Sequence, residues 1–409
     1  MNVLHINYSD IYGGAAIAGY RLHQGLLDQG IDSRLLVAMA LTRSERVAII
    51  PRKPTLENLL YRFAWRVGLN YLNCVSTFDI PKHGAYKNAD ILNFHNLHAG
   101  YLGYFNYLVL PLLTKNKPAI FTLHDMWSFT GHCAYSYDCE RWKVGCGNCP
   151  YLDAEPIVFR DNTHLAWKLK NAVYHRSNLT FVAPSRWLFE QAKQSMLSQF
   201  PIHHIPYGID TKAYQPLDSE ACRAVLGIPK HKKVLLFGSV SLENSRKGGD
   251  LLLEALSKLP ESLKADIMLL IFGENDETIT KALGMQVLSL GYLSKDCFKS
   301  LAFSAADLLI FPTRADNLPV VVQESLACGT PIVSFNLGGV SDLVRPGLTG
   351  YLAQPEDTNE LCNGIVHLLE DHSLRQRMGQ QCREIALQEY SLELQAHRYI
   401  ELYNQVLRN

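Results

Sequence analysis

The sequence has no excess of charge of either sign, since its 409 residues include 39 lysines and arginines and 39 aspartates and glutamates. This balance argues against a general nucleic-acid-binding protein. No apolar run approaches the roughly 20 residues that a transmembrane helix needs, and the first residues lack the basic-then-apolar pattern of a secretory signal. We therefore expect a cytoplasmic protein in which most of the ten cysteines are reduced.

The sequence also lacks low-complexity segments and repeats of solenoid length. Instead, short apolar runs alternate with helical or loop stretches in two successive series, a pattern that favours parallel sheets covered by helices on both faces. The runs of the first series span residues 3–7, 34–39, 90–95, 119–124 and 180–183, and those of the second span residues 232–238, 266–273, 286–291, 307–312 and 331–335. We predict an α/β protein of two doubly wound, Rossmann-like domains facing a cleft.

A chain of 409 residues is also long enough for two domains. We place an N-terminal domain at residues 1–200 and a C-terminal domain at residues 201–385, joined near the stretch 201–216. Residues 386–409 carry apolar side chains at helical spacing and should form a final helix. Ligands of such sheets bind at the carboxyl ends of the strands, so the loops that follow the strands are the first candidates for a site.

The most informative segment spans residues 316–333, which has the pattern of a loop, a short helix, a glycine stop and a buried strand. Pro319 suits the first helical position, Asp316 or Asn317 can cap the helix, and Gly329 suits the position after its end. Glu324 falls inside this helix among apolar residues, where a carboxylate needs a partner.

Two acids at this spacing, Asp316 and Glu324, followed by a Cys-Gly-Thr-Pro turn, resemble the E-x7-E region of retaining glycosyltransferases of family four, the glycogen-synthase-like group. Asp316 stands where the family usually has Glu. The resemblance implies the GT-B architecture, with an acceptor-binding first domain, a donor-binding second domain and a final helix that crosses back to the first. It also implies transfer of a sugar from a nucleoside diphosphate sugar to a glycan, lipid-linked or small-molecule hydroxyl, with retention of configuration and no cofactor required for the chemistry.

The same resemblance assigns roles within the segment. Glu324 would hydrogen-bond the ribose hydroxyls, and Asp316 would lie near the hydroxyls of the transferred sugar, because carboxylates accept strong charge-assisted hydrogen bonds. The helix N-terminus would hold the diphosphate through backbone amides. The donor-binding backbone positions are Leu318, Val320, Val321 and, after the following strand, Gly339.

A basic pair, Arg246-Lys247, stands before Gly248 at a loop-to-helix entry that follows the strand at residues 232–238. Such a pair is commonly no more than solvated surface. At a helix entry it can instead neutralise an anion, with arginine giving a fork of donors and lysine a point charge. The resemblance matches a basic residue and lysine before glycine at this place, and it implies that Arg246 and Lys247 stabilise the departing diphosphate.

Two first-domain loops are further candidates. Gly13-Gly14 follows the first strand and precedes a helix, so it is either a tight turn or a place where backbone closely approaches an anionic ligand. The resemblance puts this loop beside the donor diphosphate and the acceptor. His124 ends another strand and is either a satisfied loop histidine or a ligand of a sugar hydroxyl that Asp125 orients. The resemblance places His124 against the donor sugar. His95 and His98 are weaker candidates for the acceptor side.

Four cysteines form a separate cluster of the pattern C-x5-C-x6-C-x2-C. Three interpretations stay open: a structural zinc site, which a reducing setting favours, a pair of disulfides, or free and redox-active thiols. A similar cysteine block occurs in exopolysaccharide-type members of the resembling family. The metal ligands would be Cys133, Cys139, Cys146 and Cys149.

Residues 51–84 mix basic and aromatic side chains. They could touch an anionic membrane that carries a lipid-linked acceptor, peripherally at its inner face, or form an ordinary amphipathic helix. Two alternatives to the transferase also remain. One is another GT-B enzyme, such as a nucleotide-sugar epimerase or phosphorylase, and the other is a non-catalytic subunit that binds sugar nucleotides.

Overall fold

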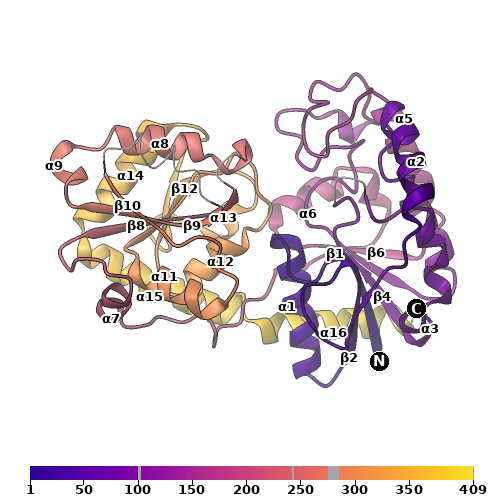
Figure 1. The fold of residues 1–409 in the computed structure, drawn as a ribbon, viewed down its shortest axis with the longest axis horizontal. Helices are drawn as coiled ribbons and strands as arrows, with labels where there is room; N and C mark the ends of the chain where they lie inside the picture. Colours follow the sequence, from indigo (N-terminus) through magenta and orange to yellow (C-terminus); the bar gives the residue numbers. More distant parts are fainter. Residues whose placement is uncertain (100–102, 242–243, 275–284, 409) are drawn as a thin grey trace. The chain divides into compact units, whose positions relative to one another are not determined.

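The computed structural model describes the whole chain apart from residues 100–102, 242–243, 275–284 and 409. The chain divides into two compact units (Figure 1). Unit 1 comprises Met1–Gly208 and Glu393–Asn409, and unit 2 comprises Ile209–Leu392. The chain therefore passes between units at residues 208–209 and 392–393, a few residues later than the sequence-based division places each boundary.

Unit 1 is built on a seven-stranded parallel sheet of order β3-β2-β1-β4-β5-β6-β7. The strands are β1 Asn2–Ser9, β2 Asp32–Met39, β3 Val47–Ile49, β4 Ile91–Phe94, β5 Ala119–Thr122, β6 Leu179–Ala183 and β7 Ile202–His204. The helices are α1 Gly14–Asp28, α2 Pro54–Arg66, α3 Gly84–Asn88, α4 Leu110–Leu113, α5 Thr163–Tyr174, α6 Arg186–Lys193 and α16 Leu392–Arg408, with the 3-10 turns η1 Val75–Lys82, η2 Tyr107–Val109, η3 Arg141–Lys143 and η4 Met196–Gln199.

The final helix α16 packs on the same face of this sheet as α1. Leu22 and Leu26 of α1 and Tyr399 and Tyr403 of α16 share one apolar core with residues of β1, β4, β5 and β6. The tyrosine hydroxyls also find partners in the sheet: Asn93 donates to Tyr403 (2.8 Å), and the Tyr399 hydroxyl lies 2.9 Å from that of Thr122. Apolar burial and satisfied hydroxyls together hold α16 on unit 1.

Unit 2 is built on a six-stranded parallel sheet of order β10-β9-β8-β11-β12-β13. The strands are β8 Lys233–Ser241, β9 Ile267–Glu274, β10 Gln286–Ser289, β11 Leu308–Phe311, β12 Ile332–Phe335 and β13 Gly350–Ala353. The helices are α7 Ser219–Val225, α8 Gly249–Ser257, α9 Glu261–Lys264, α11 Asp296–Ala305, α12 Val320–Ala327, α13 Val340–Leu343, α14 Thr358–Glu370 and α15 His372–Glu389, with the 3-10 turn η5 Ser245–Lys247.

The prediction of two doubly wound parallel α/β domains is confirmed, and each of the ten expected strands is present. Three short strands, β3, β7 and β13, were not expected. In both sheets the strand order reverses once, between β1 and β4 in unit 1 and between β8 and β11 in unit 2. Open α/β sheets bind ligands beyond the carboxyl ends of the strands at such a reversal. Among the described residues, no helix has both the length and the apolar character to cross a membrane.

Candidate active site

Helix α12 ends as the sequence predicts but begins differently. Gly329 has a left-handed φ of 73°, its N–H donates to Leu326, and the Thr330 N–H donates to Ser325, so the glycine stop is confirmed. At the other end Pro319 occupies the capping position and no side chain caps the helix. The prediction that Asp316 or Asn317 caps α12 is therefore wrong, and the physical reason lies in the other partners of Asp316.

The carboxylate of Asp316 binds the basic pair Arg246-Lys247 in the loop after β8. Its Oδ2 lies 2.7 Å from Nζ of Lys247 and 3.4 Å from Nη1 of Arg246, while its Oδ1 accepts from the Asn317 N–H at 3.0 Å. We call the three charged side chains Arg246, Lys247 and Asp316 the charged trio. Its members come from the loops after β8 and β11, the two strands at which the sheet order reverses.

Backbone contacts hold these two loops together. The carbonyl of Arg246 accepts from the Arg314 N–H at 2.8 Å and from the Thr313 hydroxyl at 2.9 Å. Gly248 has a φ of 70°, and a Cβ there would lie 1.9 Å from the carbonyl oxygen of Pro312. Only glycine permits this approach, so the loop-to-helix entry of α8 is fixed against the end of β11.

A third loop, after β12, contacts the backbone of Asp316. Gly338 has a φ of 55°, and a Cβ there would lie 2.2 Å from the carbonyl oxygen of Asp316. The N–H of Gly339 donates to that carbonyl at 3.2 Å. The predicted donor-binding Gly339 thus has a defined task in the chain, which is to fix the backbone of Asp316.

The charged trio carries one net positive charge. Burial disfavours the charged form of Asp316, but Lys247 and Arg246 outweigh it and hold the pKa of Asp316 below its ordinary value. Burial lowers the pKa of Lys247, and Asp316 opposes that shift. Two cations facing one carboxylate leave a charge that suits an anionic ligand.

The N-terminus of α12 supplies donors next to this charge. Within the described residues, the N–H groups of Val320 and Val321 donate to no other protein atom, as expected for a first helical turn, and neither does that of Leu318, just before the capping Pro319. Such free amides bind phosphate oxygens well.

Glu324 is buried in α12 and has partners from other elements of unit 2. Its Oε1 accepts from the Tyr214 hydroxyl at 3.0 Å and lies 3.6 Å from Nζ of Lys299. The same hydroxyl lies 2.7 Å from Oδ1 of Asp296. The structure thus confirms that this buried carboxylate has partners, and it adds Tyr214 and Lys299, which no sequence pattern indicated.

In unit 1, the Gly13-Gly14 loop joins β1 directly to α1. Gly13 has a φ of 86°, which favours glycine, whereas a Cβ at either glycine would meet no atom within 4 Å. No neighbouring atom of the chain therefore requires glycine at position 14. Asp10, which sequence reasoning missed, fixes the loop by accepting from the N–H groups of Ile11 and Leu41 and from both the N–H and the hydroxyl of Thr42.

His124 is held differently from the prediction. Its Nδ1 lies 2.6 Å from the Tyr207 hydroxyl and its Nε2 lies 3.0 Å from Nδ1 of His95. Asp125 pairs instead with His98, at 3.1 Å, so the expectation that Asp125 orients His124 is replaced by these two contacts. A hydrogen bond from the His124 ring to a sugar hydroxyl would need one of them to break.

The histidines His95, His98 and His124 share one small cavity at the carboxyl ends of β4 and β5. Its other lining residues are Asn96, Leu97, Phe121, Asp125, Trp127 and Ser128. The ring of His98 stacks on that of Trp127 at a centroid distance of 4.9 Å. The structure therefore brings together all four unit 1 side chains that the sequence selected around these two strands.

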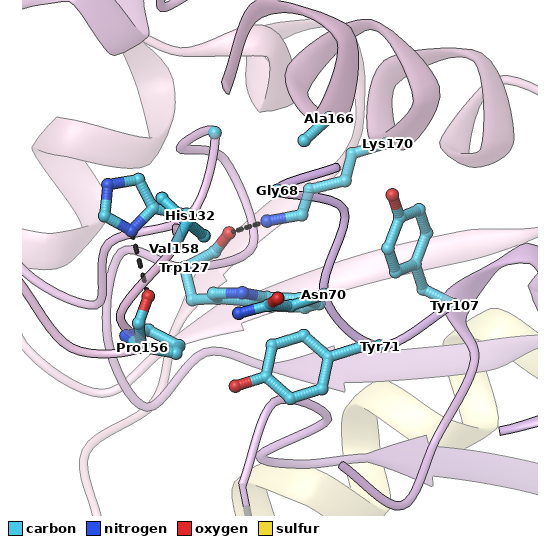
Figure 2. A pocket seen from close by; sticks show the side chains of 11 residues that line it. Gly68, Asn70, Tyr71, Tyr107, Trp127, His132, Pro156, Val158, Ala166 and Lys170 are labelled. Atoms are coloured by element: carbon cyan, nitrogen blue, oxygen red, sulfur yellow. Dashed lines mark hydrogen bonds between the residues drawn. The ribbon is translucent and has the colours of Figure 1, made fainter. Parts of the chain in front are cut away.

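Trp127 also lines a second cavity, shown in Figure 2. There the buried Nζ of Lys170 lies 3.6 Å from the indole centroid and donates to the carbonyls of Trp127 (2.6 Å) and Thr130 (3.1 Å). Burial lowers the pKa of Lys170 to about 7. Lys170 thus fixes the loop that carries Trp127 and leads into the cysteine cluster.

The four clustered cysteines are free thiols in the structure. Among the described residues, no group of three or more histidine, cysteine or acidic side chains is placed to hold a metal ion. Sγ of Cys146 instead accepts from the Gly131 N–H, and Sγ of Cys149 lies 3.4 Å from Nε2 of His132. Burial, followed by the neighbouring Cys146, raises the pKa of Cys133 to about 12. The zinc site stays a prediction.

Two family models match the chain. The model described as Glycosyltransferase Family 4 matches residues 12–213, and the model described as Glycosyl transferases group 1 matches residues 218–385. The putative colanic acid biosynthesis glycosyl transferase WcaC of Escherichia coli K12 is 28% identical over 363 residues, which cover 84% of this chain and 85% of WcaC.

Solved structures of the same fold cover the chain almost completely. Sucrose-phosphate synthase from Thermosynechococcus elongatus superposes with a TM-score of 0.73 at 19% identity and covers 100% of both chains. HepE of Anabaena in complex with UDP and glucose superposes with a TM-score of 0.70 at 18% identity and covers 99% of both chains. At this identity the likeness shows the fold, which is that of GT-B proteins.

Proposed function

We propose a reaction for this chain, which belongs to the glycosyltransferases of the family 4 and group 1 type. It moves a sugar from a nucleoside diphosphate sugar to a hydroxyl of a glycan, lipid-linked or small-molecule acceptor. The anomeric configuration is retained. Unit 2 would bind the donor and unit 1 the acceptor. The similarity to WcaC, a putative glycosyl transferase of colanic acid biosynthesis, extends over most of the chain and favours a place in polysaccharide biosynthesis. The structure of HepE with UDP and glucose supports a nucleotide-linked donor.

The observation that carries this proposal is the charged trio beside the free amides of α12. A diphosphate placed there would meet Lys247 and Arg246 together with the N–H groups of Leu318, Val320 and Val321. The bond from the anomeric carbon to the diphosphate oxygen breaks during transfer, and the oxygen gains negative charge. Donors fixed in advance at that oxygen stabilise the transition state more than the ground state.

The acceptor hydroxyl can lose its proton without a basic side chain of the protein. In the proposed front-face reaction the acceptor oxygen bonds to the anomeric carbon on the side that the diphosphate leaves, and the departing phosphate oxygen takes the acceptor proton. Configuration is then retained. The carboxylate of Asp316 would accept from a hydroxyl of the sugar while also holding Lys247 in place.

Nucleotide binding is the first test of the proposal. We expect one of UDP, GDP and ADP, at 100 times its Kd, to stabilise the protein by about 2.7 kcal/mol in a thermal-shift titration. Lys247→Ala should reduce this stabilisation, and Lys258→Ala, which removes a lysine paired with Glu254 and Thr358 in the same unit, should not. No stabilisation by any of the three would contradict the assignment of unit 2 as the donor site.

We further propose that unit 1 meets an anionic membrane surface through the outer face of α2. Leu56, Leu59 and Phe63 follow one another at helical spacing and are 47%, 66% and 70% exposed. Arg62 and Arg66 add exposed positive charges to the helix, whereas Lys53, just before it, is paired with Asp79. The only acid of the helix, Glu57, is buried and bound by Arg52 and Ser76. Apolar side chains framed by cations suit the surface of a bilayer that contains anionic lipid.

This surface predicts recruitment to vesicles. In a flotation assay the wild type should float with liposomes that contain anionic lipid and remain at the bottom with neutral ones. The double variant Leu59→Asp and Phe63→Asp should lose most of the floating fraction. Val225→Asp with Phe298→Asp, which alters two exposed apolar residues of unit 2, serves as the control and should behave as wild type. Equal flotation of both double variants would refute the membrane role of α2.

A further inference from the structure

A line of hydrogen-bonded side chains crosses one face of the unit 1 sheet. The Tyr207 hydroxyl lies 2.6 Å from Nδ1 of His124, Nε2 of His124 lies 3.0 Å from Nδ1 of His95, and Nε2 of His95 lies 2.9 Å from Nδ1 of His5. The residues come from β1, from the ends of β4 and β5, and from the segment after β7. We call these four residues the histidine chain.

The histidine chain is closed off from water at its inner end. His5 and His95 are fully buried, and Tyr207 is buried as well. Helix α1 lies over them, and a Cβ at Gly19 would come within 3.4 Å of the His95 ring, so a small residue makes the space that the ring fills. Within the described part of the chain, Nε2 of His5 has no hydrogen-bond partner. The two middle members of the histidine chain, His95 and His124, thus line the small cavity at the ends of β4 and β5, and its His5 end stops inside the fold.

Serial hydrogen bonds between neutral imidazoles allow only two proton arrangements. Each neutral ring donates from one nitrogen and accepts at the other, so one choice sets every bond in the line. A phenol O–H is a stronger acid than an imidazole N–H and is the better donor, which favours donation from Tyr207 to Nδ1 of His124. His124 and His95 would then both carry their proton on Nε2.

An added proton would disrupt this line. A protonated ring donates from both nitrogens, so the neighbouring ring that donates to it would face a second donor and the bond between them would break. Burial also disfavours the charge: it lowers the pKa of His124 to about 4 and that of His95 well below the ordinary value. Asp125 raises and His98 lowers the pKa of His124. Burial and then the neighbouring His23 hold the pKa of His5 well below its ordinary value.

We propose that His5, His95 and Tyr207 are positioning residues that fix His124 as a neutral ring with its proton on Nε2 and both ring nitrogens in use. His124 then contributes to the proposed transfer as a rigid neutral wall of the unit 1 cavity and not as a general acid or base. The inference deepens the proposed function at this one residue, and the hydrogen-bond arrangement can be tested without any substrate.

Nitrogen NMR of protein labelled with 15N-histidine tests the arrangement directly. Long-range 15N–1H correlations distinguish the two neutral tautomers from each other and from the imidazolium ion. We expect His124 and His95 to stay neutral with the proton on Nε2 between about pH 5 and 8, where an unperturbed histidine titrates. A His124 that titrates in this range, or that carries its proton on Nδ1, would overturn the proposal.

Two variants and one control connect the arrangement to activity. His95→Phe and Tyr207→Phe each remove one partner of His124, so its signals should begin to titrate and kcat should fall on the order of 10- to 100-fold with a new pH dependence. His23→Phe removes an equally buried ring whose Nδ1 bonds to Ser33 and not to the histidine chain, and it should leave the His124 signals and the pH profile unchanged. An identical response of all three variants would contradict the proposal and show that these side chains serve only to pack the core.

The two readouts separate this inference from the proposed function. If wild-type NMR gives the expected tautomers and no sugar is transferred, the histidine chain stands and the proposed function fails. If sugar is transferred and His124 titrates near pH 6.5, only the inference about the histidine chain fails.

Discussion

Replacing Lys247 by alanine is expected to lower kcat on the order of 10²- to 10³-fold, the size of effect seen when one preorganised donor is removed from a developing negative charge. Nζ of Lys247 lies 2.7 Å from Oδ2 of Asp316, and Lys247 leaves the charged trio with one net positive charge. Without Lys247 that net charge falls to zero, since Arg246 and Asp316 remain. The departing diphosphate would then lose its nearest point charge.

Steady-state kinetics with a saturating nucleotide sugar would measure this effect. Lys247→Arg keeps the charge but places a planar fork where a compact ammonium fits, so it should recover only part of the rate. Lys258→Ala is the matched control, because that lysine also forms an ion pair in unit 2 and lies outside the charged trio. Wild-type turnover in Lys247→Ala, with an unchanged Tm, would remove Lys247 from the mechanism.

Replacing Glu324 by glutamine is expected to weaken binding of the nucleoside diphosphate by about 10- to 150-fold, since a hydrogen bond to a charged group contributes roughly 1.5–3 kcal/mol. Glutamine keeps the size of the side chain and can still accept from the Tyr214 hydroxyl. It removes the charge that a ribose diol would meet and that also faces Lys299 at 3.6 Å.

Calorimetry and thermal unfolding together separate binding from folding in this variant. Asp296→Asn is the control, because Asp296 binds the same Tyr214 hydroxyl from α11. We expect Asp296→Asn to bind nucleotide as the wild type does. A lower Tm in Glu324→Gln with an unchanged Kd would show that Glu324 serves the fold alone, through Tyr214 and Lys299.

Local sequence patterns predicted the fold well because the buried strands are short apolar runs bounded by turns. The strands that escaped notice lack that pattern: β7 is Ile202–His204 and only half-buried, and β13 begins with Gly350, whose Cβ position lies 1.9 Å from the Ile332 carbonyl oxygen. A glycine chosen for close strand approach looks like a turn in the sequence. The segment becomes strand β13 because it pairs with β12, and this long-range pairing cannot be read from the local sequence.

Site residues that stand in a short sequence motif could be predicted, whereas contacts between residues far apart in the sequence could not. Lys247 and Asp316 were each selected, but nothing in the sequence shows that residues 69 positions apart share a salt bridge. That bridge is why Asp316 does not cap α12. His5 and Tyr207 escaped selection because a histidine within a strand and a tyrosine after one carry no signal until the parallel register brings them beside His95 and His124.

A time-resolved proton NMR assay would test the central claim most directly, using the nucleotide sugar whose nucleotide stabilises the protein and a panel of alkyl and lipid-linked glycosides. The account predicts that nucleoside diphosphate is released in step with a new glycoside only when acceptor is present. The anomeric proton of that product should have the coupling of the donor's own configuration, and Lys247→Ala should slow its growth on the order of 10²- to 10³-fold. A product of inverted configuration, or equal release of nucleoside diphosphate without acceptor, would contradict it.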